Sequence, residues 1–194
     1  MRPGGAPAKV TLEQAAGRVL RALDDAGVSH MLVGGLTSNY YGIPRATQDV
    51  DIVVQLTGHE PLRRVVESLG DGFSIDAQVS FETITGNARY VIRLSATPFV
   101  VELFVLGDDP FQQERFGRRV AIAIPQIGQQ VYLPTPEDVV VQKVRWGRPK
   151  DLEDAKDVMA VQAEALDMEY IETWCTRHDT RQRLRAILDQ IPPA

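Results

Sequence analysis

The 194-residue sequence has little of what defines several large protein classes. It has one cysteine, Cys175, so the chain cannot form an internal disulfide and holds no cysteine-rich metal site. No apolar run approaches the roughly 20 residues that a membrane-spanning helix needs. The opening residues, MRPGGAPAKV, also lack the apolar stretch of a secretion signal. These absences predict a cytoplasmic protein without a membrane partner.

An excess of positive charge is also missing. The chain has 21 Lys and Arg against 26 Asp and Glu, a formal net charge of −5, so it is not as a whole an electrostatic match for nucleic acid. Bound Mg²⁺ would offset some of this charge locally, so an RNA or nucleotide substrate is still compatible with the composition. The apolar fraction of 44% is sufficient for a hydrophobic core.

Helix and strand signals divide the chain into two parts. We expect a loose lead at residues 1–10, a core at 11–134, and a helical part at 135–194 packed on that core. Helices are expected at 11–26, 35–41, 60–69, 109–116, 135–146, 152–163, 167–177 and 180–190. Strands are expected at 30–33, 49–55, within 74–106, and at 118–124. This order predicts an α/β (α+β) fold with a short mixed sheet flanked by helices and followed by C-terminal helices.

The most informative segment is GGLTSNYYGIPRATQDVDIVV, residues 34–54. Asp49 and Asp51 begin an apolar strand, and alternation along a strand places them on one face, roughly 6–7 Å apart at Cα. Two carboxylates on one face can bridge two divalent cations, an arrangement that transfers phosphoryl or nucleotidyl groups. Gly34 and Gly35 precede a short helix whose free N–H groups can bind a polyphosphate. Together these features predict an enzyme that uses a metal and a nucleotide.

Glu102 is the candidate third carboxylate, because two-metal sites usually need three. It lies in the apolar strand FVVELFVL, where an ionised side chain is costly to bury unless something binds it. The alternative is a strand glutamate that faces solvent or pairs with Arg93 or Arg89. Polar residues precede Asp49 and apolar residues follow Asp51, an order that favours nucleotidyltransferases over phosphatases and glycosyltransferases that share the D-x-D pattern. A pair of merely solvated strand-edge acids is the remaining alternative.

Three motifs occur in a fixed order along the chain. They are Gly34-Gly35, then Arg45-x-Thr47-x-Asp49-Val50-Asp51-Ile52, then Val101-Glu102-Leu103-Phe104. This set resembles the nucleotidyltransferase superfamily, whose founding fold is DNA polymerase β. The downstream segment TPEDVVVQKVRWGRPKDLEDAKDV is similar to that of AbiEii-type and related bacterial nucleotidyltransferase-like proteins. The resemblance spans about residues 30–160. It identifies the superfamily but does not indicate a substrate.

The resemblance implies a nucleotidyltransferase fold and transfer of a nucleoside monophosphate from an NTP such as ATP, with release of pyrophosphate. Two Mg²⁺ or Mn²⁺ ions would be held by Asp49, Asp51 and Glu102. Lys143 is implied to contact the nucleotide phosphates, although a surface lysine is the usual alternative. Asp154 becomes a candidate for the rim of the active site. The other reading of Asp151 and Asp154 is that they pair with Arg148 or Lys150 and pin two helices together.

Several positions keep two interpretations. Gly35 stands where many members of the superfamily have serine, so the hydroxyl contact to the terminal phosphate comes from Thr37 or Ser38 or is absent. Arg45 either holds a phosphate or fixes the glycine loop by bonding carbonyls. Trp146 is more often a core residue than a base-stacking one. A basic stripe of Arg177, Arg181 and Arg185 is assigned to the last helix, as a solvated face or a contact to RNA.

The acceptor stays open at this stage. An RNA or tRNA 3′ end, an antibiotic or other small-molecule hydroxyl, and a protein side chain all fit the motifs. An RNA acceptor would suit the toxin of a toxin–antitoxin pair, with an antitoxin protein as partner. A non-catalytic member that binds a nucleotide or a partner is the alternative from a different class.

Overall fold

The computed structural model describes residues 10–76, 78–82, 84–95 and 97–191. The predicted loose lead lies outside this part of the chain, except for Val10. The α-helices are α1 Leu12–Asp25, α2 Gly34–Tyr41, α3 Glu60–Leu69, α4 Pro110–Gly117, α5 Pro136–Trp146, α6 Pro149–Gln162, α7 Met168–Arg177 and α8 Arg181–Leu188, with a 3₁₀ turn at Ala163–Ala165. The strands are β1 His30–Val33, β2 Asp49–Val54, β3 Phe73–Ile75, β4 Ser80–Phe81, β5 Ala88–Leu94, β6 Val100–Val105, β7 Val120–Ile124 and β8 Gln129–Leu133.

The strands form a mixed sheet and a separate hairpin. In the six-stranded sheet the order is β1-β2-β6-β5-β3, with β4 also paired to β5. Among the described strands of this sheet, β2 and β6 run parallel and the other pairings are antiparallel. β7 and β8 form the two-stranded hairpin. This is the short mixed sheet flanked by helices that the sequence predicts.

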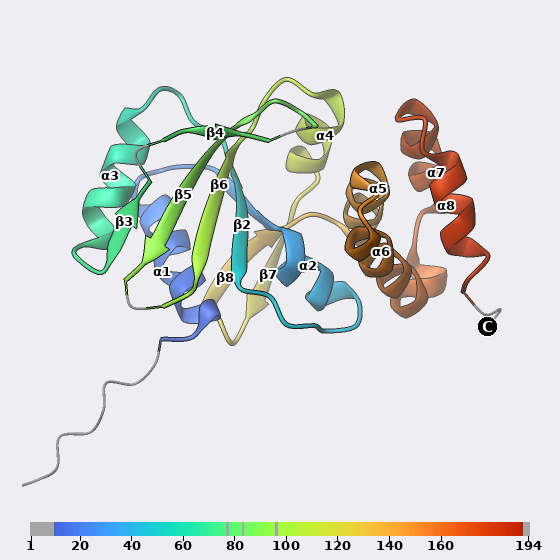
Figure 1. The fold of residues 1–194 in the computed structure, drawn as a ribbon, viewed down its shortest axis with the longest axis horizontal. Helices are drawn as coiled ribbons and strands as arrows, with labels where there is room; N and C mark the ends of the chain where they lie inside the picture. Colours follow the sequence, from blue (N-terminus) through green and yellow to red (C-terminus); the bar gives the residue numbers. More distant parts are fainter. Residues whose placement is uncertain (1–9, 77, 83, 96, 192–194) are drawn as a thin grey trace, which may run out of the picture.

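Figure 1 shows α1 and α3 beside the sheet, whereas α5, α6, α7 and α8 gather on the side of the molecule that carries α2. The boundaries follow local chemistry. At the start of α1, Thr11 and Gln14 cap each other's backbone N–H groups. α5 begins with Thr135 as N-cap and Pro136 in the first turn, and ends at Gly147 with φ 68°.

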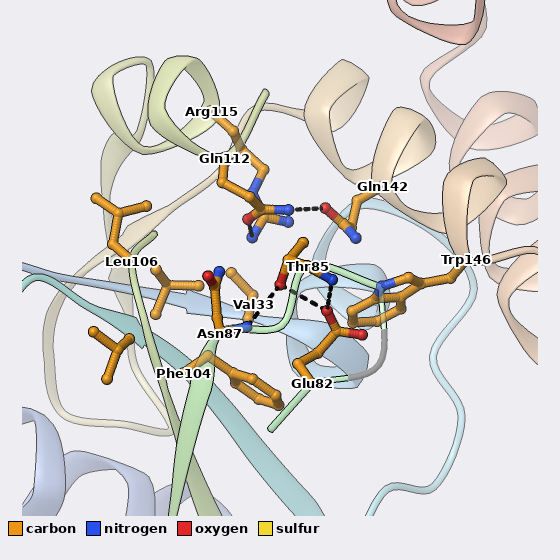
Figure 2. Close-up of a pocket in the computed structure, with 12 residues that line it drawn as sticks. Val33, Glu82, Thr85, Asn87, Phe104, Leu106, Gln112, Arg115, Gln142 and Trp146 are labelled. Carbon is orange, nitrogen blue, oxygen red and sulfur yellow. Dashed lines mark hydrogen bonds between the residues drawn. The ribbon is translucent and has the colours of Figure 1, made fainter. Parts of the chain in front are cut away.

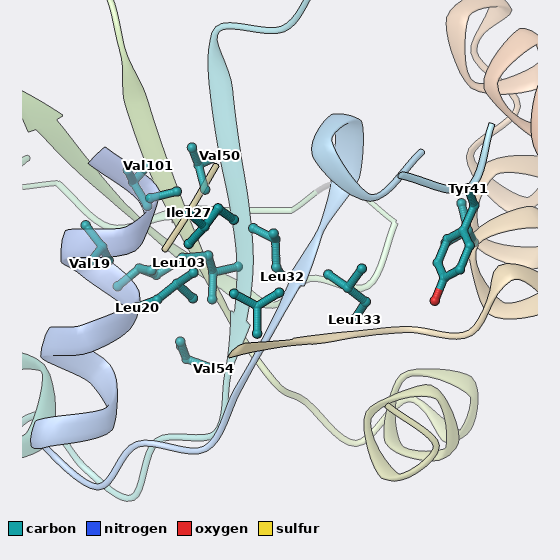
Figure 3. Packing of buried hydrophobic residues seen from close by; sticks show 14 of the residues in the cluster. Val19, Leu20, Leu32, Tyr41, Val50, Val54, Val101, Leu103, Ile127 and Leu133 are labelled. Carbon is teal, nitrogen blue, oxygen red and sulfur yellow. The ribbon is translucent and has the colours of Figure 1, made fainter. Parts of the chain in front are cut away.

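One hydrophobic core joins the sheet to both sets of helices. Alternate residues of β2, namely Val50, Ile52 and Val54, are fully buried. Figure 3 shows Val50 and Val54 packed near Val19 and Leu20 of α1. The same buried cluster continues into α5 to α8, for example at Ile171 and Leu184. In the described residues no helix is long and apolar enough to cross a membrane.

Three details differ from the sequence-based expectation. Strand β8 was not predicted, because QQVYL has only three apolar residues and its hairpin partner lies outside the local pattern. α6 begins at Pro149, three residues early, because proline is well tolerated in the first turn of a helix. The assignment of the basic stripe to one helix is wrong. Arg177 ends α7, and the chain turns through Asp179 with φ 56° before α8 begins.

Candidate active site

The sheet places three carboxylates on the face that α1 does not cover. Val50, Ile52 and Val54 point into the core, so alternation puts Asp49 and Asp51 on the opposite face of β2. In the parallel register Asp51 lies beside Glu102 of β6. We call Asp49, Asp51 and Glu102 the acidic face. The sequence predicted each of these residues, and the structure brings all three together.

The acidic face lines a cleft of about 570 Å³. The remaining lining residues are of two kinds, cationic or acidic side chains and large apolar ones. They are Arg89, Arg148, Lys150, Glu82, Phe81, Ile84, Phe104 and Trp146. A cleft with carboxylates on one side and cations around it suits a ligand that carries both phosphates and a divalent cation.

The surroundings of the Asp51 carboxylate raise its pKa. Burial, together with the negative charges of Glu102 and Asp49, raises its pKa from the ordinary 3.8 to about 6. Lys143 and Lys150 act in the opposite direction. The acidic face therefore holds more negative charge than the surrounding cations balance, and a bound divalent cation would relieve it.

The two glycines are required by close contacts with neighbouring side chains. Gly34 has φ 70°, and a Cβ atom there would lie 1.8 Å from Asp51 Oδ2. A Cβ atom on Gly35 would lie 3.0 Å from Thr47 Oγ1. Packing against the chain therefore explains both glycines, and α2 begins directly beside the Asp51 carboxylate. Phosphate binding by Gly34 and Gly35 stays a prediction.

The α2 hydroxyls are committed to the backbone. Thr37 Oγ1 donates to Leu32 O at 3.1 Å, and Ser38 Oγ donates to Gly34 O at 3.2 Å. Both side chains are buried. Of the predicted alternatives for a hydroxyl contact to phosphate, its absence agrees best with this arrangement.

Glu102 pairs with a cation. Its carboxylate oxygens accept from Arg89 Nη1 at 3.2 and 3.3 Å, which is one of the alternatives drawn from the sequence. Within the described residues, no three Asp, Glu, His or Cys side chains form a group that could hold a metal ion. The oxygen donors of Asp49 and Asp51 nevertheless have the chemistry that Mg²⁺ prefers. Glu102 would join them only after its pair with Arg89 opens.

Lys143 is buried in a group of paired charges. Its Nζ donates to Asp154 Oδ2 at 2.7 Å and to Asp151 Oδ1 at 3.1 Å. Arg148 also pairs with Asp151, as one sequence alternative proposed, but Arg148 is the N-cap of α6 itself, so Lys143 and not Arg148 links α5 to α6. A contact between Lys143 and nucleotide phosphates remains a prediction. It requires Nζ to exchange an aspartate partner for a phosphate.

Arg45 pairs with an aspartate of α6, and its predicted contact to a phosphate stays a prediction. Its Nε and Nη2 donate to the two oxygens of Asp154 at 2.6 and 2.8 Å. The residue therefore ties the loop after α2 to α6, and within the described residues it makes no hydrogen bond to a glycine-loop carbonyl. We call Lys143, Asp151, Asp154, Arg45 and Arg148 the ion-pair cluster.

Two cations that line the cleft, Arg148 and Lys150, were not assigned to the site from the sequence. Lys150 is exposed there and forms no ion pair with any residue that the structure describes. A signal existed, because residues 143–150 hold four cations in eight positions. Trp146, interpreted mainly as a core residue, is only half-buried and lines the cleft.

Sequence comparisons give no relative of the chain. No protein-family model matches it, and no curated protein matches it. Solved structures match it in fold. ANT(2″)-Ia in complex with adenylyl-2″-tobramycin aligns at a TM-score of 0.56 and 14% identity, over 88% of this chain and 98% of that one.

Two further structures agree with this match. An antigenic nucleotidyltransferase-like protein from Paracoccidioides brasiliensis has a TM-score of 0.54 and 19% identity, covering 90% of this chain and 92% of its own. The lincosamide antibiotic adenylyltransferase LnuA, bound to lincomycin, has a TM-score of 0.52 and 12% identity, covering 78% of this chain and 98% of its own. The sheet, the carboxylates on its open face and these alignments together show that the chain has the nucleotidyltransferase fold.

Proposed function

We propose that the protein is a metal-dependent nucleotidyltransferase that moves an NMP from an NTP to an acceptor hydroxyl. One observation carries the proposal. The parallel register of β2 and β6 gathers Asp49, Asp51 and Glu102 in a single cleft, directly beside the N-terminus of α2. The fold alone would be compatible with a binding protein, whereas Asp49 and Asp51 have no cationic partner among the described residues and repel each other unless a ligand neutralises them.

The reaction balances without any further co-reactant. The oxygen of the acceptor hydroxyl forms a bond to the α-phosphorus, and the bond from that phosphorus to the α–β bridging oxygen breaks. Pyrophosphate leaves with the electron pair of that bond. The hydroxyl proton goes to Glu102 or to water. Asp49 and Asp51, joined by Glu102, would hold Mg²⁺ or Mn²⁺, which supplies charge neutralisation of the triphosphate.

The phosphates would be bound by cations on the wall of the cleft. Lys150 is exposed there, and its positive charge acts on Asp51. Arg148 lines the same cleft and stacks over Trp146 at 4.8 Å. The N–H groups of Gly34 and Gly35 lie in the first turn of α2, where a helix leaves N–H groups without internal partners. The backbone and these side chains would together position the triphosphate.

A small-molecule hydroxyl is the acceptor we favour. Two of the structures with the same fold contain an antibiotic or its adenylyl product. The net charge of −5 also disfavours a long nucleic acid. RNA modification by a toxin with a cognate antitoxin has one supporting feature, the exposed arginines Arg177, Arg181 and Arg185.

A non-catalytic nucleotide-binding role is the second candidate. The ion pair between Arg89 and Glu102 favours it, because that pair withholds the third carboxylate from a metal. The two candidates differ in turnover, not in binding.

Pyrophosphate release separates them. The protein is incubated with Mg²⁺, each NTP in turn and a panel of aminoglycosides, lincosamides and short RNAs, and pyrophosphate is measured. We expect release that needs both metal and acceptor and that Glu102→Gln abolishes. Nucleotide binding without release for any acceptor, at the wild-type protein, would favour the non-catalytic role.

A further inference from the structure

A small recess opens beside the cleft, and hydrogen-bond donors line part of its wall. The acceptor oxygens of Glu82 on the opposite part are already engaged by the backbone N–H groups of Ile84 and Thr85 and by the Thr85 hydroxyl. The recess has a free volume of about 30 Å³ and shares Glu82, Phe104 and Trp146 with the cleft. Figure 2 shows Gln112, Arg115 and Gln142 along one side of it and Trp146 at another. The volume has room for about one or two water-sized groups, so the recess accepts a small group rather than a whole ring or a phosphate.

A buried arginine orients one of these donors. Arg115 Nη2 donates to Gln112 Oε1 at 2.7 Å, and Gln112 Nε2 donates to Gln142 Oε1 at 2.6 Å. Arginine can only donate, so the direction of the chain is fixed and both amide orientations follow from it. The last group in the chain is the Gln142 Nε2 amide, which must therefore present N–H to whatever it faces (Figure 2).

Three further donor atoms at the recess have no acceptor among the described residues. Gln142 Nε2, Trp146 Nε1 and Arg115 Nε are all buried and make no hydrogen bond to the described residues. Gln142 and Arg115 are each 4% exposed. Arg115 also has no carboxylate partner within the described part of the chain. A buried donor without a partner destabilises the fold, so three around one recess indicate an acceptor atom supplied from outside the chain.

We propose that this recess receives the exocyclic keto oxygen of the nucleobase, so that the protein prefers keto bases (guanine, uracil) to adenine. The inference rests on the proposed function, because it needs a nucleotide in the adjoining cleft. With the phosphates near the acidic face, the base would lie toward Phe104 and Trp146, the residues at which cleft and recess meet. An exocyclic amino group would place its own N–H donors against the donors of the recess, and these donors would stay without an acceptor.

Two pairs of nucleotides isolate this contact. ITP and ATP differ at position 6 by keto against amino, and UTP and CTP differ in the same way at position 4. Binding of each to the wild-type protein is measured by titration calorimetry in Mg²⁺. We expect the keto member of at least one pair to bind about tenfold more tightly, which is the effect of one hydrogen bond to a buried donor.

Gln142→Glu converts the terminal donor into an acceptor and should reverse this preference. Trp146→Phe removes the indole N–H and keeps an aromatic ring, and should reduce the preference, which covers the case in which Gln142→Glu does not fold. Gln113→Glu makes the same chemical change on the exposed side of α4 and should leave the preference unchanged. Circular dichroism at the titration temperature checks that each variant is folded.

Each outcome separates the inference from the function on which it rests. ATP bound as tightly as ITP, together with CTP bound as tightly as UTP, would overturn the keto preference and leave nucleotide transfer standing. A keto preference that survives both Gln142→Glu and Trp146→Phe in folded protein would also overturn it, because the recess would then not be its source. No binding of any nucleotide would overturn the proposed function and the inference with it.

Discussion

The acidic face and the ion-pair cluster are both groups of five or fewer charged side chains, but they balance their charges differently. In the ion-pair cluster both carboxylates, Asp151 and Asp154, are almost fully buried. Each of them is paired with two of the three cations Lys143, Arg45 and Arg148. On the acidic face only Glu102 has an ion-pair partner among the described residues. Asp49 is exposed and Asp51 is half-buried in an open cleft.

The comparison distinguishes charges that stabilise the fold from charges that a bound ligand would neutralise. Balanced charges in the interior gain nothing from a new partner and lose much when one member is removed. Unbalanced carboxylates in a cleft gain from a cation. We therefore expect substitutions in the ion-pair cluster to change stability and substitutions on the acidic face to change binding.

Removal of Lys143 should have the largest effect. Lys143→Met leaves Asp151 and Asp154 buried with one cation fewer, and we expect the free energy of unfolding to fall by about 3 kcal/mol. Urea denaturation measures the change. Lys156→Met is the control, because the pair of Lys156 with Glu153 lies nearer the surface and should contribute less than about 0.5 kcal/mol. Equal losses in both variants would mean that the cluster does not stabilise the fold.

Asp51→Asn should change stability in the opposite direction. Folding raises the pKa of Asp51 to about 6, so the folded metal-free protein binds this proton more tightly than the unfolded chain does. The stability that Asp51 contributes is therefore fully present below about pH 4 and is lost as the pH rises through 6. Because the side chain is only half-buried, we expect the variant to be more stable than wild type by about 1–2 kcal/mol at pH 7.5.

Thermal unfolding of wild type and Asp51→Asn between pH 4 and pH 8, with chelator present, measures this effect. The gap between the two melting temperatures should widen as the pH rises. Asp49→Asn should show a smaller gap, because Asp49 is exposed. A gap that stays constant with pH would mean that folding does not raise the pKa of Asp51.

Lys150→Ala should weaken triphosphate binding without affecting the fold. Lys150 lines the cleft, whereas Lys156 lies on the same helix outside it. We expect about tenfold weaker binding of NTP in Mg²⁺ and a smaller loss for the corresponding NMP, since a charge-assisted contact to the outer phosphates is lost. Lys156→Ala should bind both as wild type does. Equal losses for NTP and NMP would place Lys150 away from the outer phosphates.

The smallest effect concerns Arg89. Arg89→Gln should release Glu102 and tighten Mg²⁺ binding in the absence of nucleotide by about threefold, a change typical of a partly exposed ion pair. Metal titration monitored by calorimetry measures it, with Arg93→Gln as control because Arg93 pairs with Asp76 instead. Weaker Mg²⁺ binding in Arg89→Gln would mean that Glu102 is not a metal ligand.

The two regions also differ in how far the sequence predicts them. The acidic face follows from local rules, because alternation along a strand fixes the side of Asp49 and Asp51, and an acid within an apolar strand marks Glu102. Helix caps at Thr11 and Thr135 are equally local. The fold class could therefore be predicted from motifs and boundaries alone.

The ion-pair cluster and the recess depend on contacts between distant residues. Arg45 and Asp154 are 109 positions apart, and Gln112 and Gln142 are 30 apart. No periodicity indicates which arginine meets which aspartate, so the pairing of Arg45 with Asp154 could not be predicted. Gln142 and Arg115 have no motif of their own, and only their burial without acceptors marks them.

The central claim is that Asp49 and Asp51 bind a metal–nucleotide complex. Titration calorimetry of the wild-type protein and of the double variant Asp49→Asn/Asp51→Asn, with NTP in the presence and absence of Mg²⁺, tests it most directly. We predict that wild type binds NTP only with Mg²⁺, and that the double variant stays folded and does not bind. A folded double variant that binds Mg²⁺–NTP as tightly as wild type would contradict the account.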